Sequence, residues 1–236
     1  MSNIINEKAR IYAGEEFSIT STEGKKYLLR IEESWDAEDP RTWDNLGTML
    51  CCNRRYRLGD CNSNEETEEA LIELCRKYGK TDEEIDEMTF SDEVRFLLNQ
   101  ENICSLPLWI YDHSGISMST GAVDQWDSSF VGLIYVEKEN FIECVGYEPD
   151  DWKAEATKIL REEISTYDDY LQGNIYAYYI YEPTVVITQT MDGDEISREI
   201  NEKGVEVDSC CGIYGLNLEY IKENSTINIA EIEQVR

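Results

Sequence analysis

Positive charge is scarce in this chain. Twenty-one Lys and Arg stand against fifty Asp and Glu, so the 236 residues carry a formal net charge of -29. Such a field repels nucleic acid and anionic lipid, and it attracts basic surfaces. Direct binding of nucleic acid is therefore disfavoured, and we expect the partner to be a basic protein.

Long apolar runs are missing as well. No segment approaches the ~20 apolar residues of a membrane span, and the first residues lack the basic start and apolar run of a signal peptide. We therefore expect a protein that lies in the cytoplasm and makes no contact with a membrane.

Several catalytic signatures are also missing. The chain has one histidine, and it has no Gly-x-Ser-x-Gly, Gly-x-Gly-x-x-Gly, P-loop, EF-hand or Cys-x-x-Cys pattern. The sequence motifs typical of hydrolases, of nucleotide-binding proteins and of structural zinc sites are thus absent. We expect no cofactor and no metal, and we favour a binding protein over an enzyme.

Hydrophobic residues nevertheless make up 41% of the chain and aromatic residues 11%, enough for a packed core. Residues 8–33 alternate in the manner of a β-hairpin, with Phe17 and Ile19 facing Tyr27, Leu29 and Ile31 across a turn at residues 21–24. Residues 43–56 are compatible with a helix or a buried loop.

Three short helices are expected between residues 62 and 99. Ser63 with Glu66 and Thr81 with Glu84 fit capping boxes, Gly79 fits a helix end, and Ser91 is the expected start of the third helix. A longer helix is expected from Asp151 to Leu171. Strands are expected at 106–111, 130–136, 175–181, 184–190, 196–200 and 205–208. A last helix is expected at 216–223, and turns are expected at 192–193 and 209–212.

Strands with helices grouped beside them are typical of the α+β class. We expect one domain over residues 1–236. It should have a largely antiparallel sheet, helices packed beside the sheet, and a helical insert or sub-lobe near residues 62–99.

The stretch Trp35–Asp60 is nearly neutral in a strongly acidic chain, because residues 1–60 hold eleven acids and nine bases. Its arginines suit an anion such as phosphate, but they also suit ion pairs with neighbouring acids, among them Asp36, Glu38, Asp39, Asp44 and Asp60. We favour internal pairing and expect a structural hub formed by Trp35, Trp43, Arg54, Arg55 and Arg57.

The helical insert carries the densest negative charge. Acids spaced over a folded surface attract Lys and Arg grooves that otherwise bind the phosphates of duplex DNA, although most charge runs are only solvated faces. The partner-binding residues that we predict are Glu65, Glu66, Glu68, Glu69, Asp82, Glu83, Glu84, Asp86 and Glu87.

His113 supports an alternative, a small metal-dependent hydrolase or nuclease built from Asp112, His113, Asp124 and Asp127. Three acids and a histidine within sixteen residues are near to chance in this composition. Cys51 and Cys52 precede Arg54 and Arg55, which favours thiolate formation, but we favour packed, free thiols for all eight cysteines.

Four segments resemble a family of uncharacterised acidic proteins encoded by bacteriophages and other mobile elements. They are WDNLGTMLCCNRRYRLGD, LPLWIYDHSGISMSTG, WDSSFVGLIYV and DSCCGIYG, and together they cover about a quarter of the chain. The resemblance implies a phage context and no catalytic residues. Antirestriction DNA mimics are similar in charge only.

We therefore expect an anti-defence protein that binds and inhibits a basic, nucleic-acid-handling host protein, such as a restriction or CRISPR nuclease. The metal-dependent hydrolase remains one alternative, and a phage structural or assembly protein is another.

Overall fold

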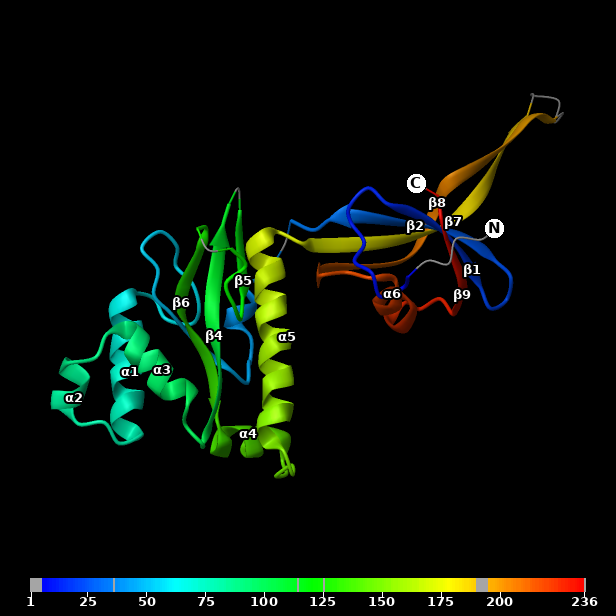
Figure 1. The fold of residues 1–236 in the computed structure, drawn as a ribbon. Coiled ribbons are helices and arrows are strands. Elements are labelled where there is room, and N and C mark those ends of the chain that lie inside the picture. Colours follow the sequence, from blue (N-terminus) through cyan, green and yellow to red (C-terminus); the bar gives the residue numbers. More distant parts are fainter. Residues whose placement is uncertain (1–5, 36, 114, 125, 190–194, 236) are drawn as a thin grey trace. The chain divides into compact units, whose positions relative to one another are not determined.

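The structure is a computed structural model that describes residues 6–35, 37–113, 115–124, 126–189 and 195–235, with the backbone alone for 186–189, 195–200, 202 and 203. Within these residues, six α-helices and nine strands in two antiparallel sheets confirm the α+β class (Figure 1). The chain forms two compact units, one of Met1–Glu38 with Asn174–Arg236 and one of Asp39–Gly173. Whether they fold as one domain stays a prediction, since compact grouping does not test independent folding.

The first unit begins with the expected hairpin of β1 (Glu16–Ser21) and β2 (Lys26–Glu33). Phe17 pairs with Leu29 and Ile19 with Tyr27, so the alternating apolar residues share one buried face. Gly24 permits the turn because its φ is 78°.

The sheet of this unit has the order β8-β7-β2-β1-β9. Its other elements are β7 (Ile175–Gln189), β8 (Glu195–Tyr214), α6 (Leu218–Asn224) and β9 (Ile229–Gln234). Leu218 and Ile221 of helix α6 belong to the same buried cluster as the apolar face of the hairpin. Figure 1 shows the helix beside this sheet. The strand β9 was not expected from the sequence.

Two expected breaks in this sheet were wrong. Pro183 lies inside β7. The pairing of β7 with β2 ends at Tyr181, and the register between β7 and β8 shifts at Pro183. The missing N–H of Pro183 therefore interrupts no regular ladder of hydrogen bonds. Ser209–Gly212 lies inside β8, where Gly212 at φ 70° accompanies another register shift. This small-residue segment forms a bulge in place of a turn. The expected turn at Asp192-Gly193 lies outside the described residues.

The second unit has a four-stranded sheet in the order β3-β6-β4-β5. Its helices cover both faces, with α1 and α3 on one side and α5 on the other (Figure 1). The elements are η1 (Pro40–Thr42), β3 (Thr48–Cys51), α1 (Asn64–Lys77), α2 (Asp82–Asp86), α3 (Phe90–Leu98), β4 (Ile103–Asp112), β5 (Ile116–Ser119), β6 (Ser128–Glu137), α4 (Lys138–Val145) and α5 (Trp152–Gln172).

Successive strand residues supply the two cores of this unit. Leu133 points to the α1 and α3 side, and its neighbour Ile134 points to the α5 side. Strands β4 and β6 are thus covered on both faces, as their near-continuous apolar runs predict. Gly132 is required where β6 meets β3, because a Cβ there would lie 1.9 Å from the carbonyl oxygen of Leu50.

The segment 43–56 is neither a helix nor a simple loop, because it contains β3. The four-residue strand was too short to show a period in the sequence. Helix α4 was also missed, since its N-cap residue Glu137 makes no side-chain hydrogen bond and so gives no capping signal.

The helical insert is confirmed. The Ser63 hydroxyl accepts from the Glu66 N–H to cap α1, and Thr81 with Glu84 forms the expected capping box of α2. The third start was wrong by two residues, because Thr89 caps α3 in a box with Asp92 and Ser91 lies within the helix. In the described residues, no helix combines the length and apolar composition needed to span a bilayer.

Candidate functional site

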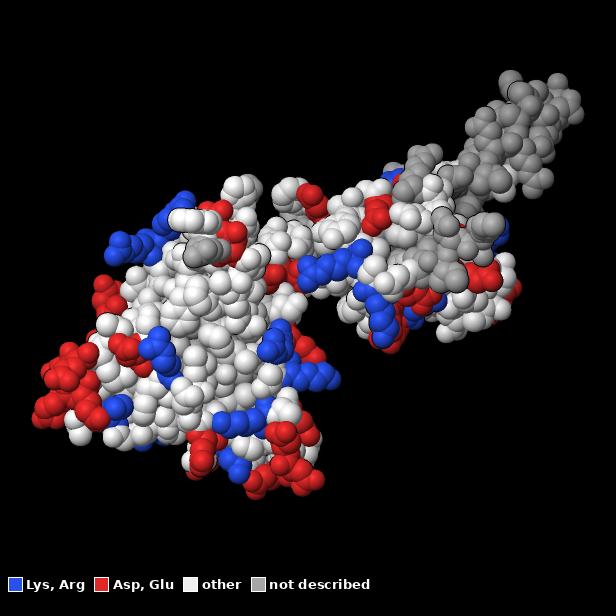
Figure 2. Space-filling view, in the orientation of Figure 1, with Lys and Arg blue, Asp and Glu red and all other residues white. Residues whose placement is uncertain are grey.

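The carboxylates of the helical insert are presented to solvent. Each of the nine predicted partner-binding acids is exposed, and we call this set the acidic surface: Glu65, Glu66, Glu68, Glu69, Asp82, Glu83, Glu84, Asp86 and Glu87. Acidic atoms gather over α2 in the space-filling view (Figure 2). The opposite sides of α1 and α2 bury Leu71, Leu74 and Ile85, so packing fixes which faces remain outside.

Few cations neutralise the acidic surface. Arg76 pairs with Asp82 at 2.6 Å and Lys80 with Glu84 at 2.8 Å. For the other seven acids, no Lys or Arg in the described part of the chain lies within ion-pair distance. Residues 62–99 as a whole hold twelve acids and four bases. The surface thus keeps most of its negative charge for an external partner.

Helix ends explain part of this charge. A carboxylate in the first turn of a helix is stabilised by the unpaired backbone N–H groups and the helix dipole. Its own backbone N–H and the Ser63 hydroxyl lower the pKa of Glu65, and hydrogen bonds from Lys80 and the Thr81 backbone lower the pKa of Glu84. Glu68, Glu69, Asp86 and Glu87 lie beyond the first turns, and capping does not account for them.

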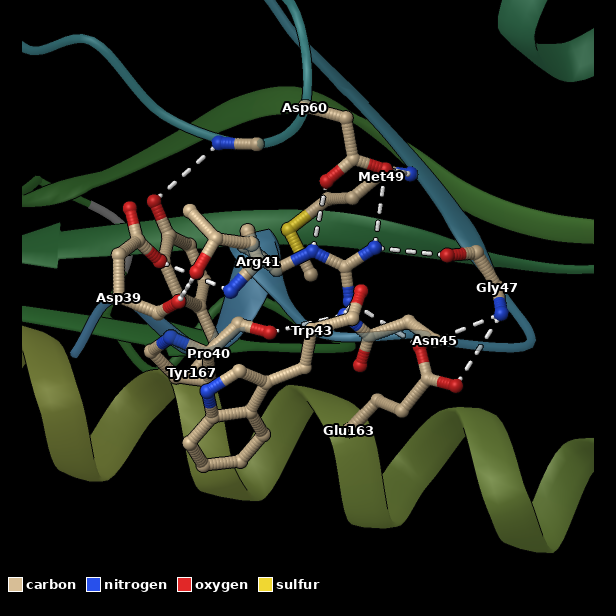
Figure 3. Close-up of polar contacts among 12 residues, drawn as sticks. Asp39, Pro40, Arg41, Trp43, Asn45, Gly47, Met49, Asp60, Glu163 and Tyr167 are labelled. Atoms are coloured by element: carbon tan, nitrogen blue, oxygen red, sulfur yellow. Dashed lines mark hydrogen bonds and ion pairs between the residues drawn. The ribbon is translucent and has the colours of Figure 1, made fainter. Parts of the chain in front are cut away.

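The internal ion pairs expected of the arginine-rich stretch belong to Arg41, which sequence reasoning missed. The side chain of Arg41 is 3% exposed, and it donates from Nε to Asp60 Oδ1 at 2.7 Å and from Nη1 to Glu163 Oε2 at 3.0 Å (Figure 3). Its Nη2 also reaches the carbonyl oxygen of Gly47 at 2.6 Å. One guanidinium thereby joins η1, the loop before α1, and helix α5.

The two acids in this network are themselves held by the backbone. Glu163 accepts from the N–H groups of Leu46 and Gly47, and Asp60 accepts from the N–H of Met49 at 2.7 Å (Figure 3). Every part of the network is satisfied inside the unit, so its geometry indicates a structural role. The available sequence signal was Asp39-Pro40, an N-cap with proline in the first helical turn just before Arg41.

The five residues expected to form the hub have exposed side chains. Trp35 is 89% exposed and Trp43 43%, and Arg54, Arg55 and Arg57 lie on the surface loop between β3 and α1. Arg55 pairs with Asp112 at 2.6 Å, and Arg57 donates to Asn62. Arg54 makes no hydrogen bond or ion pair with any described residue. The stability role of these five side chains stays a prediction.

The alternative hydrolase residues lie around the end of β4. Asp112 accepts from Arg55 and from the Tyr56 hydroxyl, and His113 Nδ1 lies 3.5 Å from Asp127. Asp124 Oδ1 accepts from the N–H groups of Trp126 and Asp127, as in a turn. Within the described ranges, no three His, Cys, Asp or Glu side chains are grouped to hold a metal ion.

The environment of Cys51 and Cys52 disfavours the thiolate form. All eight are free thiols, as expected. Burial raises the pKa of Cys51 far above its ordinary range and raises the pKa of Cys52 to about 11. The nearby arginines therefore do not produce a thiolate nucleophile at neutral pH.

Comparison of the chain with protein-family models, with curated proteins and with solved structures found no match. The candidate site therefore has to be interpreted from its own geometry, and the resemblance to phage-encoded acidic proteins stays a prediction.

Proposed function

We propose that this protein binds a basic, nucleic-acid-handling protein through the acidic surface and blocks its nucleic-acid groove. The observation that carries the proposal is the set of nine exposed carboxylates on two capped helices, of which only Asp82 and Glu84 pair with a Lys or Arg in the described part of the chain. On α1, Glu65 with Glu68 and Glu69 recurs at i, i+3 and i+4, about 5–6 Å apart. Such a row presents negative charge in fixed positions, as a phosphate backbone does.

The energetic basis is electrostatic. A groove that binds DNA gains affinity by releasing condensed counterions, and a rigid acidic surface offers the same lysines and arginines a replacement anion array. The helices are already formed, so little conformational entropy is lost on binding. Association should therefore be fast and strongly dependent on salt.

The biological setting follows from the same proposal. An inhibitor of restriction or CRISPR nucleases acts in the bacterial cytoplasm, and the resemblance to proteins of bacteriophages and mobile elements supports an anti-defence role of this kind. The proposal requires no catalytic residue and no cofactor.

Affinity capture from a bacterial lysate tests the proposal, with duplex DNA as competitor. The wild-type chain should retain a basic nucleic-acid-binding protein at low salt and release it in about 1 M NaCl or excess DNA, because both treatments remove the counterion-release advantage. Retention in molar salt would contradict the proposal.

A matched pair of variants locates the surface. The first replaces the nine acids by Gln or Asn, which keeps the capping box of α2 because glutamine also serves at that position. The control removes nine other exposed acids: Glu23, Glu33, Glu101, Glu139, Glu143, Asp150, Glu223, Glu231 and Glu233. The first variant should lose the captured protein and the control should retain it. Equal loss from both would show that net charge matters and the acidic surface does not.

A further inference from the structure

A hollow of about 260 Å³ opens beside the arginine-bearing loop between β3 and α1. It is lined by Arg54, Arg55 and Arg57, and none of its lining residues is Asp or Glu. In a chain with fifty acids, a hollow lined by three cations and no acid is an unusual environment. Figure 2 shows basic atoms gathered where Figure 1 draws this loop.

The arginines are only partly neutralised by the protein. Asp112 holds one of them, Arg55, and lies outside the lining of the hollow. Among the described residues, Arg54 and Arg57 have no carboxylate within ion-pair distance. Counting only the lining of this hollow and its ion pair, three guanidinium charges are set against one carboxylate, an excess of two positive charges.

Two amides add hydrogen-bond donors. Asn53 Oδ1 accepts from the N–H groups of Arg55 and Tyr56, and Asn62 Oδ1 accepts from Arg57, so internal donors occupy both carbonyl oxygens. Neither Nδ2 group donates to a described residue, and both asparagines line the hollow. The Nδ2 donors of these two lining residues thus have no acceptor in the described chain.

We propose that this hollow binds the phosphate group of a phosphorylated small molecule. A phosphate monoester carries close to two negative charges at neutral pH and offers three acceptor oxygens, which matches the excess charge and the donor set. Planar guanidinium groups bind such oxygens in pairs, whereas a carboxylate brings one charge and two oxygens.

A second hollow, lined in part by the same loop, offers a place for the rest of the ligand. It measures about 570 Å³ and shares Arg54 and Arg55 with the first. Its lining includes Tyr56, Phe90 and Ile110, which suit an apolar or aromatic body attached to the phosphate, and it also includes the carboxylates of Glu68 and Asp112. The second hollow borders the acidic surface at Glu68, but phosphate binding by the arginines does not depend on the proposed inhibition.

Calorimetric titration of the full chain at constant ionic strength and pH 7.5 tests the phosphate site. The probes are phenyl phosphate and benzoate, which differ chiefly in the anionic group. Phenyl phosphate should bind at least about tenfold more tightly than benzoate, because more charge-assisted hydrogen bonds form. Equal binding of both probes, or no heat from phenyl phosphate up to about 10 mM, would overturn the proposal.

Variants separate the hollow from general charge attraction. Arg54→Gln with Arg57→Gln should weaken phenyl phosphate binding about tenfold or more, and Arg54→Gln alone, which removes no contact within the described chain, should weaken it measurably. The control pair Lys158→Gln and Arg161→Gln lies on an exposed part of α5 and should stay within about twofold of wild type. Unchanged binding in the Arg54 and Arg57 variants would overturn the proposal.

Discussion

Arg41 shows how one side chain determines the stability of a whole segment. Its guanidinium is almost fully buried, yet each of its bonds has a carboxylate or carbonyl acceptor. Removing one member of such a network leaves the partners' charges desolvated and unpaired. This destabilises a protein more than replacing the whole ion pair by apolar residues does.

Arg41→Ala should therefore lower the free energy of unfolding by about 3 kcal/mol, since Asp60 and Glu163 would lose their cation. Urea unfolding at pH 7 measures the loss. Arg95→Ala is the control, because Arg95 forms an exposed pair with Asp92 and should change stability by about 0.5 kcal/mol or less. Equal losses would mean that the Arg41 network contributes no more than a surface pair.

Glu93 on α3 is a buried acid, and its ionised form lowers the stability of the folded state to an extent that depends on pH. Burial, with the neighbouring charges of Glu68 and Asp92, raises its pKa. A carboxyl whose folded pKa is raised favours the folded state below the unfolded pKa, and this contribution is lost as pH rises through the folded pKa.

Glu93→Gln should therefore be more stable than wild type at pH 7 and close to wild type at pH 4, because the neutral amide keeps the shape and removes the buried charge. Urea midpoints at both pH values measure the difference. Glu101→Gln, at an exposed position, controls for the removal of one charge. A gain at pH 7 no larger than that of the control would show that Glu93 is well solvated when ionised.

Capping explains which elements were predictable from the sequence. Helices α1, α2 and α5 have Ser63, Thr81 and Asp151 as N-caps, and each was expected at its observed start. The hairpin of β1 and β2 was predictable because alternation and a glycine turn coincide. Elements without a local signal, such as α4 and β3, are formed by tertiary packing and pairing, which single-sequence patterns do not contain.

Thr89 and Ser91 offer a direct test of the corrected start of α3. Thr89→Ala should lower stability by about 1 kcal/mol because the hydroxyl caps the N–H of Asp92, whereas Ser91→Ala should change it little or raise it, since Ser91 lies within the helix. Thermal or urea unfolding distinguishes the two. A larger loss from Ser91→Ala would restore the start expected from the sequence.

The candidate site was only partly visible in the sequence. The exposure of the nine acids follows from helical periodicity, so their surface position was predictable. The sequence could not predict whether Arg54 and Arg57 form internal ion pairs or line an open hollow, because the answer depends on which acids lie nearby in three dimensions. Arg55 pairs with Asp112, an acid fifty-seven residues away that was not among the expected partners.

At the scale of the whole molecule, net charge sets how stability responds to salt. A formal charge of -29 repels itself more strongly in the folded state than in the expanded unfolded chain. Counter-ions at moderate ionic strength shorten the range of this repulsion to about 8–10 Å.

The unfolding temperature should therefore rise when NaCl increases from about 20 to 300 mM, because screening relieves the self-repulsion. Differential scanning calorimetry measures the change. The variant with nine neutralised acids should show a smaller rise than wild type. A fall in the unfolding temperature of the wild type would show that favourable ion pairs outweigh the repulsion.

The division of the chain has a consequence for its synthesis. Strand β1 pairs with β9, so the sheet of the first unit joins the two ends of the sequence, and Asp39–Gly173 is made in between. On the ribosome, β1 and β2 remain without their partner strands while these residues are made, roughly 7 to 27 seconds at ordinary translation rates. The hairpin's apolar face stays uncovered during that time. Nascent chains are thus most open to chaperones, or to aggregation, at β1 and β2.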